Sequence, residues 1–303
     1  MFKETRGRRL TSREAARVLG VSEASVKRWA DSGLLPMEKT AGGHRRFRPE
    51  DLAAARRGGL VGGEAPLPRS RGALSTPAAH APELAPGRAD ALAEETFRAL
   101  LDGRDEELSS LLVGLHLDGH SVGRLADGLL CAAMRRVGDL WHAGEISIAQ
   151  EHVATRTAVV ALQALRASLQ VGAGDERVRA LCCSVEDDFH ELPLRLAALT
   201  LEASGLAVFD LGPSTPFNAL AEAVHRFRPG LVCVSSTVLL RLDRAAYDYA
   251  SFSKAARRAG ASVVLGGAGF RDEGIRRRLP ADLYAESFGQ LEEFAGRLAA
   301  DES

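Results

Sequence analysis

The chain has 303 residues, 46% of them hydrophobic, and a formal net charge of −1. This composition is that of an ordinary globular protein with room for two or three domains. No apolar run approaches the length that spans a bilayer, and the N-terminal residues lack the pattern of a signal peptide. These features argue against membrane and secreted classes, and we expect a cytoplasmic protein.

Charge is unevenly spread along the chain. Residues 1–58 contain 14 Lys and Arg against 7 Asp and Glu, which gives about +7 there and about −8 in the remainder. A basic end on an acidic body indicates a nucleic-acid-binding module attached to another domain. The alternative at this level is a basic surface that is merely solvated.

The four cysteines lie in apolar runs, and none has a zinc-ligand spacing to another Cys or His. Adjacent residues on a strand point to opposite faces, so the two neighbouring cysteines are not expected to pair. We therefore expect buried free thiols in a reducing compartment, at Cys131, Cys182, Cys183 and Cys233.

Residues 10–57 have the pattern of short helices. Thr11 and Glu14 make a capping box at the start of the first helix. Ser22 caps a second helix, which we expect to run from about residue 23 to 32. Two helices joined by a turn of about three residues predict a helix-turn-helix.

A hairpin, the wing, is predicted beside the second helix, with Gly42-Gly43 as its two-residue turn. Trp29 stands three residues after Val26 and is expected in the core rather than on DNA. Side chains suited to phosphates and base edges fall on the second helix and the wing, at Ser25, Lys27, Arg28, His44, Arg45 and Arg46.

This head resembles the MerR family of winged-helix regulators. The elements that carry the resemblance are Val21-Ser22-x-x-Ser25-Val26-x-Arg28-Trp29, Gly33-Leu34-Leu35-Pro36 and Gly43-His44-Arg45-Arg46-Phe47. Metal sensors of that family place cysteines after a long dimerisation helix. None is found there in this sequence, which argues against metal sensing.

A tether and a helical bundle follow the head. Residues 58–88 are rich in Gly, Pro, Ala, Ser and Arg and have no apolar periodicity, which predicts a flexible linker. Four amphipathic stretches with short connections then predict an antiparallel four-helix bundle, at about 89–102, 105–117, 121–143 and 147–170.

The junction between the last two helices of the bundle carries four unusual side chains, Trp141, His142, Glu151 and His152. Taken alone, Trp141 would fill the core and the Glu-His pair would be solvated. The spacing Trp141-x9-Glu151-His152, however, resembles the cap of the CarH/LitR family of cobalamin photoreceptor repressors. That resemblance implies that Trp141 covers the upper face of adenosylcobalamin. It also implies that Glu151 and His152 line the same pocket, and that His142 takes the upper cobalt position after photolysis.

From Arg177 onward, apolar strands alternate with helical segments, which predicts a doubly wound, flavodoxin-like parallel sheet. Gly266-Gly267-Ala268-Gly269 has neither the order nor the acidic partner of a dinucleotide fingerprint. The expected strands are 178–185, 206–211, 231–236, 262–266 and 282–285.

His190 follows the first of these strands, at the carboxyl edge where open α/β sheets bind ligands. Asp188, two residues earlier, can hold one ring nitrogen and leave the other free for a metal. With Ser235-Ser236-Thr237 and Gly266-Gly267 downstream, the series resembles the cobalamin-binding signature Asp-x-His-x-x-Gly … Ser-x-Thr/Leu … Gly-Gly.

This second resemblance implies that His190 is the lower ligand of cobalt. Ser235 and Thr237 would hydrogen-bond the buried nucleotide tail of the cofactor, and Gly266 and Gly267 would let the tail approach the backbone. One position departs from the signature, because Pro193 stands where the family has glycine. Proline adds bulk and removes a donor beside the corrin site, which bears on affinity and on the cobalamin form preferred.

The sequence therefore predicts a multidomain chain with an α-rich winged helix-turn-helix, a four-helix bundle and a doubly wound Rossmann-like domain. Its resemblance implies a light-sensing repressor, not an enzyme, whose cofactor is adenosylcobalamin. In the dark a homo-oligomer, a dimer or tetramer, would hold operator DNA, with no membrane partner. The predicted boundaries are 1–57 for the head, 58–88 for the tether, 89–172 for the bundle and 173–303 for the body.

Two alternatives remain open from the sequence. One is a regulator of the same build that binds cobalamin without sensing light, or that has lost the cofactor, and Pro193 is its best support. The other is a corrinoid carrier for methyl transfer. The basic head and the absence of a substrate domain speak against the carrier.

Overall fold

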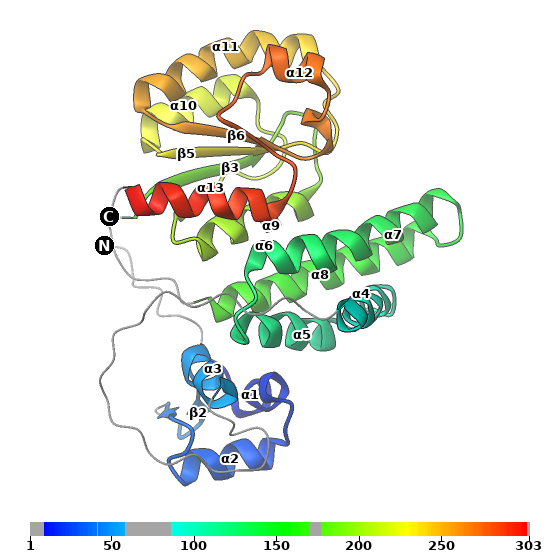
Figure 1. Ribbon diagram of the computed structural model, residues 1–303, viewed down its shortest axis with the longest axis vertical. Helices are drawn as coiled ribbons and strands as arrows, with labels where there is room; N and C mark the ends of the chain where they lie inside the picture. Colours follow the sequence, from blue (N-terminus) through cyan, green and yellow to red (C-terminus); the bar gives the residue numbers. More distant parts are fainter. Residues whose placement is uncertain (1–8, 41, 58–85, 170–176, 302–303) are drawn as a thin grey trace. The chain divides into compact units, whose positions relative to one another are not determined.

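The structure, a computed structural model, describes residues 9–40, 42–57, 86–169 and 177–301 (Figure 1). The chain divides into two compact units. Most of the predicted tether lies outside the described residues, and the helix after it begins at Pro86, three positions earlier than expected. The first unit comprises Met1–Ser121 and Gly128–Gln170; the second comprises Val122–Asp127 and Val171–Ser303.

The head has the winged helix-turn-helix arrangement that the sequence predicts. The capping box is present: the Thr11 hydroxyl accepts the Glu14 N–H at 3.2 Å, and the Glu14 carboxylate accepts the Thr11 N–H at 2.7 Å. Gly20 ends the first helix in the left-handed region, with φ 67°. Ser22 caps the second helix. The elements are α1 (Ser12–Leu19), α2 (Glu23–Asp31), β1 (Glu38–Lys39), β2 (Arg45–Arg46) and α3 (Pro49–Arg57).

The wing turn differs from the expected two-residue Gly42-Gly43 turn. Thr40 and His44 are paired through the backbone, with the Thr40 N–H donating to the His44 carbonyl at 2.9 Å. Gly43 lies between them in the left-handed region, with φ 77°. The loop is therefore one position longer than predicted, in the manner of hairpins that end on a left-handed glycine. Trp29 packs against the buried cluster of the head but remains half-buried.

The bundle contains the predicted helices with one interruption. The expected helix 121–143 is broken by a π-helical segment, Ala126–Cys131, a form that often marks functional sites in helices. A second capping box, Ser147 with Gln150, starts the last helix. The regular elements are α4 (Pro86–Leu101), α5 (Asp105–Leu117), α6 (Val122–Leu125), α7 (Ala132–His142) and α8 (Ile148–Ser168).

Helix α6 belongs to the second unit although the bundle surrounds it in sequence. Both oxygens of Asp127 accept backbone N–H groups, from Phe288 and Gly289, at 2.9 Å each. These donors stand at the start of α13, where N–H groups lack intrahelical partners and a negative charge is favourable. A Cβ at Gly123 would lie 3.0 Å from the Phe288 carbonyl, so the glycine permits close packing.

A five-stranded parallel sheet forms the second unit. Its order is β4-β3-β5-β6-β7, which is the flavodoxin-like order. The strands are added on one side of β3 and then on the other, so the strand order reverses between β3 and β5. The strands match the predicted ones within two residues at either end. They are β3 (Arg179–Ser184), β4 (Ala207–Asp210), β5 (Leu231–Ser235), β6 (Ser262–Gly266) and β7 (Leu283–Ala285).

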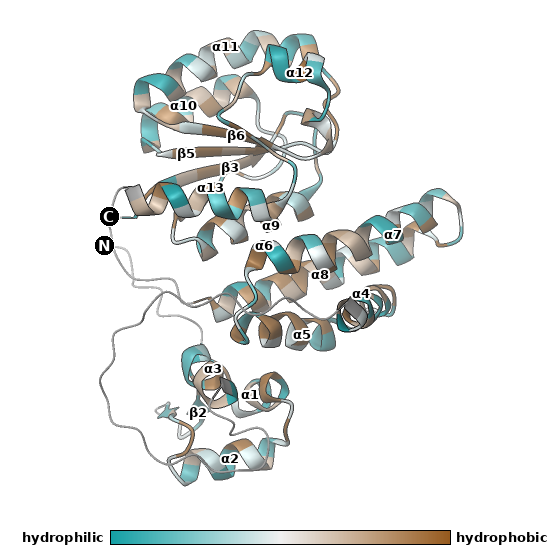
Figure 2. Cartoon of the chain, in the orientation of Figure 1, coloured by the Kyte–Doolittle hydropathy of each residue, from teal (hydrophilic) through white to brown (hydrophobic). Residues whose placement is uncertain are grey.

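Helices cover both faces of the sheet, as Figure 1 shows. One buried cluster joins the sheet to α10 and α11, and another joins it to α9 and α13. The central strands are accordingly the most hydrophobic part of the unit (Figure 2). The helices are α9 (Glu191–Ala203), α10 (Phe217–Phe227), α11 (Leu242–Ala259), α12 (Glu273–Arg278) and α13 (Phe288–Asp301), with a 3-10 turn at Ala268–Phe270.

The cysteines are free thiols, as expected. Cys182, Cys183 and Cys233 are buried in the central strands, whereas Cys131 is half-buried. Burial and the hydrogen bond with Cys233 raise the pKa of the Cys182 thiol, the hydrogen bond having the larger effect. Within the described ranges no helix is long and apolar enough to cross a membrane.

Candidate functional site

The loop after β3 holds His190 in a defined orientation. The His190 Nδ1 atom lies 2.7 Å from Asp188 Oδ1. A carboxylate only accepts hydrogen bonds, so this contact places a ring proton on Nδ1. The His190 side chain is 60% exposed and that of Asp188 is 1% exposed. An exposed imidazole held through Nδ1 by a buried carboxylate is the arrangement of a histidine oriented for a metal at Nε2.

Asp188 is the most connected side chain at this edge. Besides the His190 ring, its Oδ1 accepts the His190 N–H at 3.0 Å, and its Oδ2 accepts the Thr237 N–H at 2.5 Å. Burial raises the pKa of Asp188, but the hydrogen bonds from His190 and Thr237 outweigh it, so the pKa lies below its usual value. Asp188 is therefore ionised when it holds His190.

The carboxyl ends of the central strands bring the other predicted residues into one row. Ser184, Ser235 and Gly266 are register partners across β3, β5 and β6. Thr237 follows two residues after Ser235 and is half-buried. The sequence-predicted set Asp188, His190, Ser235, Thr237, Gly266 and Gly267 thus lies together at one edge of the sheet.

The glycines of this edge pack against the backbone at Ser236. A Cβ at Gly267 would lie 2.3 Å from the Ser236 carbonyl oxygen, and φ there is 101°. A Cβ at Gly269 would lie 2.2 Å from the Ser236 hydroxyl. Gly269 was not among the predicted site residues, because only the folded loop reveals what it touches. These glycines serve a close contact between the loops after β5 and β6.

Two buried hydroxyls at this edge lack a hydrogen-bond partner among the described residues. They are Ser184 Oγ and Ser236 Oγ. Buried polar groups are nearly always paired, so such a pair at a ligand-binding edge fits a site that a polar ligand completes. The sequence pointed to Ser235 and Thr237 instead. Neither strand periodicity nor the motif distinguishes Ser236 from its neighbours.

Pro193 does not disturb the loop. It is the third residue of α9, where a backbone N–H has no intrahelical acceptor, so proline removes no helical hydrogen bond. The contact between His190 and Asp188 is kept. The proline is therefore compatible with both the helix and the His190–Asp188 contact.

Large apolar side chains surround the motif and were missed by the sequence reasoning. Phe189 is 70% exposed, and Leu240 and Val238 in the loop after β5 are also exposed. The Val238 N–H points to Asp188 Oδ2 at 3.4 Å. Exposed apolar groups of this size around a polar centre are typical of a surface that a ligand covers.

The predicted cap residues lie in the first unit, on α7 and α8. Trp141 is 46% exposed, which rules out the reading of a core tryptophan. His142 and His152 are exposed, and Ile148 and Val153 nearby are exposed as well. An exposed apolar face with two imidazoles suits a flat ligand with an apolar rim.

Glu151 is engaged within its own helix. Its Oε1 accepts the Thr155 hydroxyl at 2.8 Å, and its Oε2 lies 3.7 Å from His152 Nε2. The described ranges contain no cluster of three His, Cys, Asp or Glu side chains that would hold a metal without another ligand.

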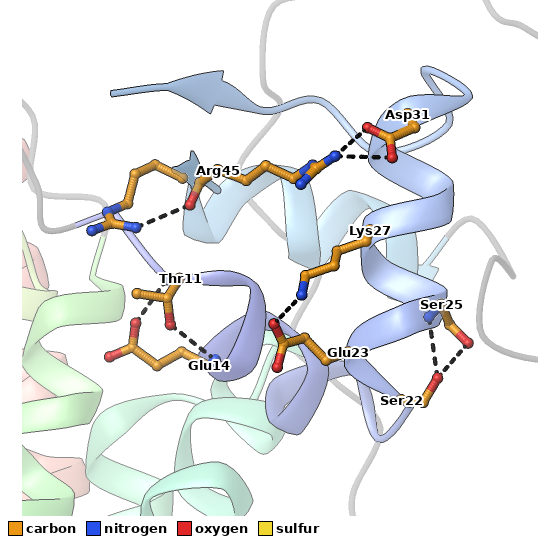
Figure 3. A network of polar contacts seen from close by, with 9 residues as sticks. Thr11, Glu14, Ser22, Glu23, Ser25, Lys27, Asp31 and Arg45 are labelled. Atoms are coloured by element: carbon orange, nitrogen blue, oxygen red, sulfur yellow. Dashed lines mark hydrogen bonds and ion pairs between the residues drawn. The ribbon is translucent and has the colours of Figure 1, made fainter. Parts of the chain in front are cut away.

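Two basic side chains of the head form ion pairs with acids of α2 (Figure 3). Lys27 pairs with Glu23 at 2.7 Å, and Arg45 pairs with Asp31 at 2.6 Å. Arg28 is exposed and has no ion-pair partner among the residues that the structure describes.

The remaining predicted DNA residues also differ in their contacts. The hydroxyl of Ser25 lies 2.9 Å from that of Ser22, within the helix cap. Arg46 donates to the carbonyl of its neighbour Arg45 at 3.1 Å, and His44 is exposed at the wing turn. Of the predicted DNA-binding residues, Arg28 and His44 are therefore the exposed ones that have no ion-pair partner among the described residues.

Comparison with known proteins agrees with a DNA-binding head followed by a ligand-binding part. Residues 9–59 match the family model of a helix-turn-helix domain, and residues 92–166 match that of a B12 binding domain. The chain is 27% identical to the HTH-type transcriptional repressor CarH of Myxococcus xanthus over 89% of this chain and 93% of that protein. In its order of domains the chain is similar to this helix-turn-helix, B12-binding type of repressor.

A second relative has the same build. The HTH-type transcriptional repressor CarA of Myxococcus xanthus is also 27% identical, over 87% of this chain and 88% of the relative. Both comparisons reach from the head through the sheet. They confirm that the chain is a regulator rather than an enzyme and that its cofactor is a cobalamin.

Among solved structures, the monomethylamine corrinoid protein of Methanosarcina barkeri has the same fold. The TM-score is 0.58 at 19% identity, and the match covers 69% of this chain and 99% of that one. The predicted multidomain fold class is confirmed. The carrier alternative is supported by this shared fold and by the Dimethylamine corrinoid protein 2 of Methanosarcina mazei, which is 22% identical over 52% of this chain and 74% of that protein. Against it stands the match of residues 9–59 to a helix-turn-helix domain.

Proposed function

We propose that this chain is an adenosylcobalamin-dependent, light-sensing transcriptional repressor. The observation that carries the proposal is the coexistence, in one chain similar to CarH, of a winged head with His190 held by Asp188 at the sheet edge. The head offers the basic surface that a DNA partner requires. The oriented, exposed imidazole offers the ligand atom that cobalt requires.

The residues of the second unit would hold the cofactor from below. His190 Nε2 would ligate cobalt, and Asp188 would keep the ring in the right tautomer. Ser235 and Thr237 would contact the nucleotide tail, and Gly266 and Gly267 would keep the loops close. Ser184 and Ser236 are further candidates for hydrogen bonds to the tail, since their buried hydroxyls have no partner among the described residues.

The residues of the first unit would hold it from above. Trp141 would cover the upper face, with Glu151 and His152 lining the same pocket. His142 would provide the imidazole for the upper position once that position is vacant. When bound, adenosylcobalamin supplies a weak cobalt–carbon bond that light breaks. The exposed state of Trp141 in the free chain supports a role on a ligand.

Repression would depend on assembly. A homo-oligomer, a dimer or tetramer, would hold several heads on one operator, and linked heads bind more tightly than single ones. Arg28, Lys27, Ser25, His44 and Arg46 would form the DNA surface, and Arg45 lies beside them on the wing. DNA as partner implies that the chain works in the cytoplasm, and the proposal includes no membrane partner.

One experiment on the full chain tests the proposal. The protein is mixed with adenosylcobalamin in the dark and then lit with green light. Absorption spectra, light-scattering mass and affinity for a duplex selected in vitro with the dark complex are compared before and after illumination. We expect a spectral change, a fall in mass and loss of DNA binding.

The controls separate the parts of the proposal. His190→Ala is expected to weaken cofactor binding, whereas His225→Ala, an exposed histidine on α10, is expected to leave it unchanged. A complex with the same mass and DNA affinity in dark and light would leave the light-independent regulator as the function. A chain that binds cobalamin but selects no DNA would leave the corrinoid carrier.

A further inference from the structure

Asp31 and Arg45 connect the end of the second helix to the wing. The Arg45 Nη2 atom lies 2.6 Å from Asp31 Oδ1 and 2.9 Å from Asp31 Oδ2 (Figure 3). Asp31 is the last residue of α2, and Arg45 begins β2. The two side chains are 55% and 25% exposed, so the pair lies at the surface of the head.

An aspartate is unfavourable at this end of a helix. The C-terminus of a helix carries a partial negative charge and favours cations. The rest of α2 follows that rule, with Glu23 in its first turn and Arg28 in its last. Asp31 opposes the rule, so its presence needs another source of stabilisation. The only ion-pair partner that the described residues offer it is Arg45.

An aspartate is also unfavourable beside DNA. The phosphate backbone is the main source of affinity for DNA-binding heads, and a carboxylate near it repels the phosphates. Asp31 stands on the same helix as Arg28, which is exposed and unpaired among the residues described. Both the helix and the ligand therefore disfavour this residue, and a positioning role accounts for it.

The wing needs such an attachment. Strands β1 and β2 have two residues each, paired as Glu38 with Arg46 and Lys39 with Arg45. A hairpin this short is not stable by itself. At the base of the hairpin, Glu38 accepts a hydrogen bond from Arg48 at 2.6 Å. Phe47, the residue directly after β2, is buried. Among the ion pairs of the described residues, the Asp31–Arg45 pair is the one that joins the wing to the second helix.

We propose that Asp31 is a positioning residue that sets the wing against α2 through Arg45, so that Arg45 contacts Asp31 and not a phosphate. This rests on the proposed DNA-binding function. The pair fixes the distance between the exposed side chains of the helix and the wing turn, where Arg28 and His44 stand. A positively charged wing residue in the sequence thus acts through another residue rather than on the DNA.

The head provides its own control. Glu23 is a second acid on α2, and it pairs with Lys27 at 2.7 Å on the same helix. That pair holds no second element. Replacing either acid removes one negative charge from the helix, but only Asp31 holds the wing. Simple electrostatics and positioning therefore predict opposite results for Asp31→Ala.

The experiment measures the affinity of the full chain for a duplex selected in vitro with the wild-type protein. We expect Asp31→Ala to weaken binding about fivefold although a negative charge is lost, and Glu23→Ala to leave it equal or tighter. Arg45→Ala should weaken binding to a similar extent, and the double variant should be no weaker than either single one. The slope of log affinity against log salt should stay that of wild type in all of them.

A charge reversal guards against misfolding. Asp31→Arg combined with Arg45→Asp is expected to recover affinity relative to either single reversal, with unchanged helical content by circular dichroism. Asp31→Ala binding as tightly as wild type, or tighter, would overturn the inference. A salt slope lowered by about one in Arg45→Ala would also overturn it, since that marks a lost phosphate contact. A wild-type chain that selects no duplex would instead overturn the proposed function.

Discussion

Asp188 and Thr237 join the loop after β3 to the loop after β5, because the Thr237 N–H donates to Asp188 Oδ2 at 2.5 Å. The other oxygen of the same carboxylate holds the His190 ring at 2.7 Å. One side chain therefore orients the expected cobalt ligand and the expected tail-binding loop together. Replacing Asp188 should therefore weaken contacts to both the cobalt and the nucleotide tail of the ligand.

The first prediction is for Asp188→Asn. An amide has one acceptor oxygen, so it loses at least one of the two contacts, and its NH₂ group also favours the wrong His190 tautomer. We expect the affinity for adenosylcobalamin to fall by about 10- to 100-fold, as for other residues that orient a metal ligand. Absorbance titration in the dark measures it. Glu222→Gln, an exposed acid on α10, is the matched control, and equal affinities in both variants would contradict the role of Asp188.

The second prediction concerns pH. The pKa of Asp188 is lowered in the folded chain, because hydrogen bonds from His190 and Thr237 outweigh the effect of burial. A group whose pKa falls on folding stabilises the fold above its unfolded pKa, and this stabilisation is lost as the pH falls through the folded pKa. Urea unfolding of wild type and Asp188→Asn should therefore differ by a constant free energy at neutral pH. The difference should shrink in the acidic range, and a difference independent of pH down to the most acidic point would count against it.

The third prediction concerns the start of the head. Thr11→Ala removes one half of the capping box on α1 and should lower the free energy of unfolding of the head by about 1 kcal/mol. Glu14→Gln keeps an acceptor for the Thr11 N–H and should lower it less. Thermal unfolding followed by circular dichroism measures both. Equal losses in the two variants would mean that charge, not the hydrogen bond to Thr11, stabilises this end.

The fourth prediction concerns the glycines at the sheet edge. Gly267→Ala would bring a Cβ to 2.3 Å from the Ser236 carbonyl at φ 101°, and Gly269→Ala would bring one to 2.2 Å from the Ser236 hydroxyl. Each should destabilise the second unit by about 2 kcal/mol or more, from strain and overpacking. Gly296→Ala in α13, where a Cβ meets nothing within 4 Å, should be neutral or stabilising. Denaturant unfolding compares the three.

A second-site change distinguishes the two clashes. Ser236→Ala removes the hydroxyl that Gly269→Ala would meet but leaves the carbonyl that Gly267→Ala would meet. It should therefore relieve part of the loss in Gly269→Ala and none in Gly267→Ala. Rescue of both, or of neither, would show that the contacts at Ser236 are not the cause.

Local signals account for what the sequence predicted well. Thr11, Ser22 and Gly20 act on their own helices, and the strand pattern of the second unit is carried by consecutive apolar residues. The residues of the carboxyl edge were chosen through their resemblance to the cobalamin-binding signature, and they lie at or shortly after the ends of strands. Their mutual contact then depends only on the parallel topology.

Contacts between distant segments account for what was missed. The π-helical segment and the assignment of Val122–Asp127 to the second unit depend on Asp127 meeting the start of α13, 161 residues later. Nothing in the helical periodicity of that stretch records the contact. The pairing of Arg45 with Asp31 is of the same kind, because a basic wing residue carries no local sign of its partner. Gly269 is a further example, because the Ser236 side chain leaves no room for a Cβ there.

The buried thiols of the central strands make the opening of the second unit measurable by thiol labelling. A thiol reagent attacks the thiolate, and burial in the sheet both shields Cys183 and raises its pKa, so that attack requires the sheet to open. Cys182 and Cys233 are enclosed in the same way, while the half-buried Cys131 reports on the bundle. The rate at which these buried thiols are labelled in native buffer should therefore report how often the second unit opens. A ligand bound at the carboxyl edge should lower that labelling rate, and no engineered probe is needed to measure it.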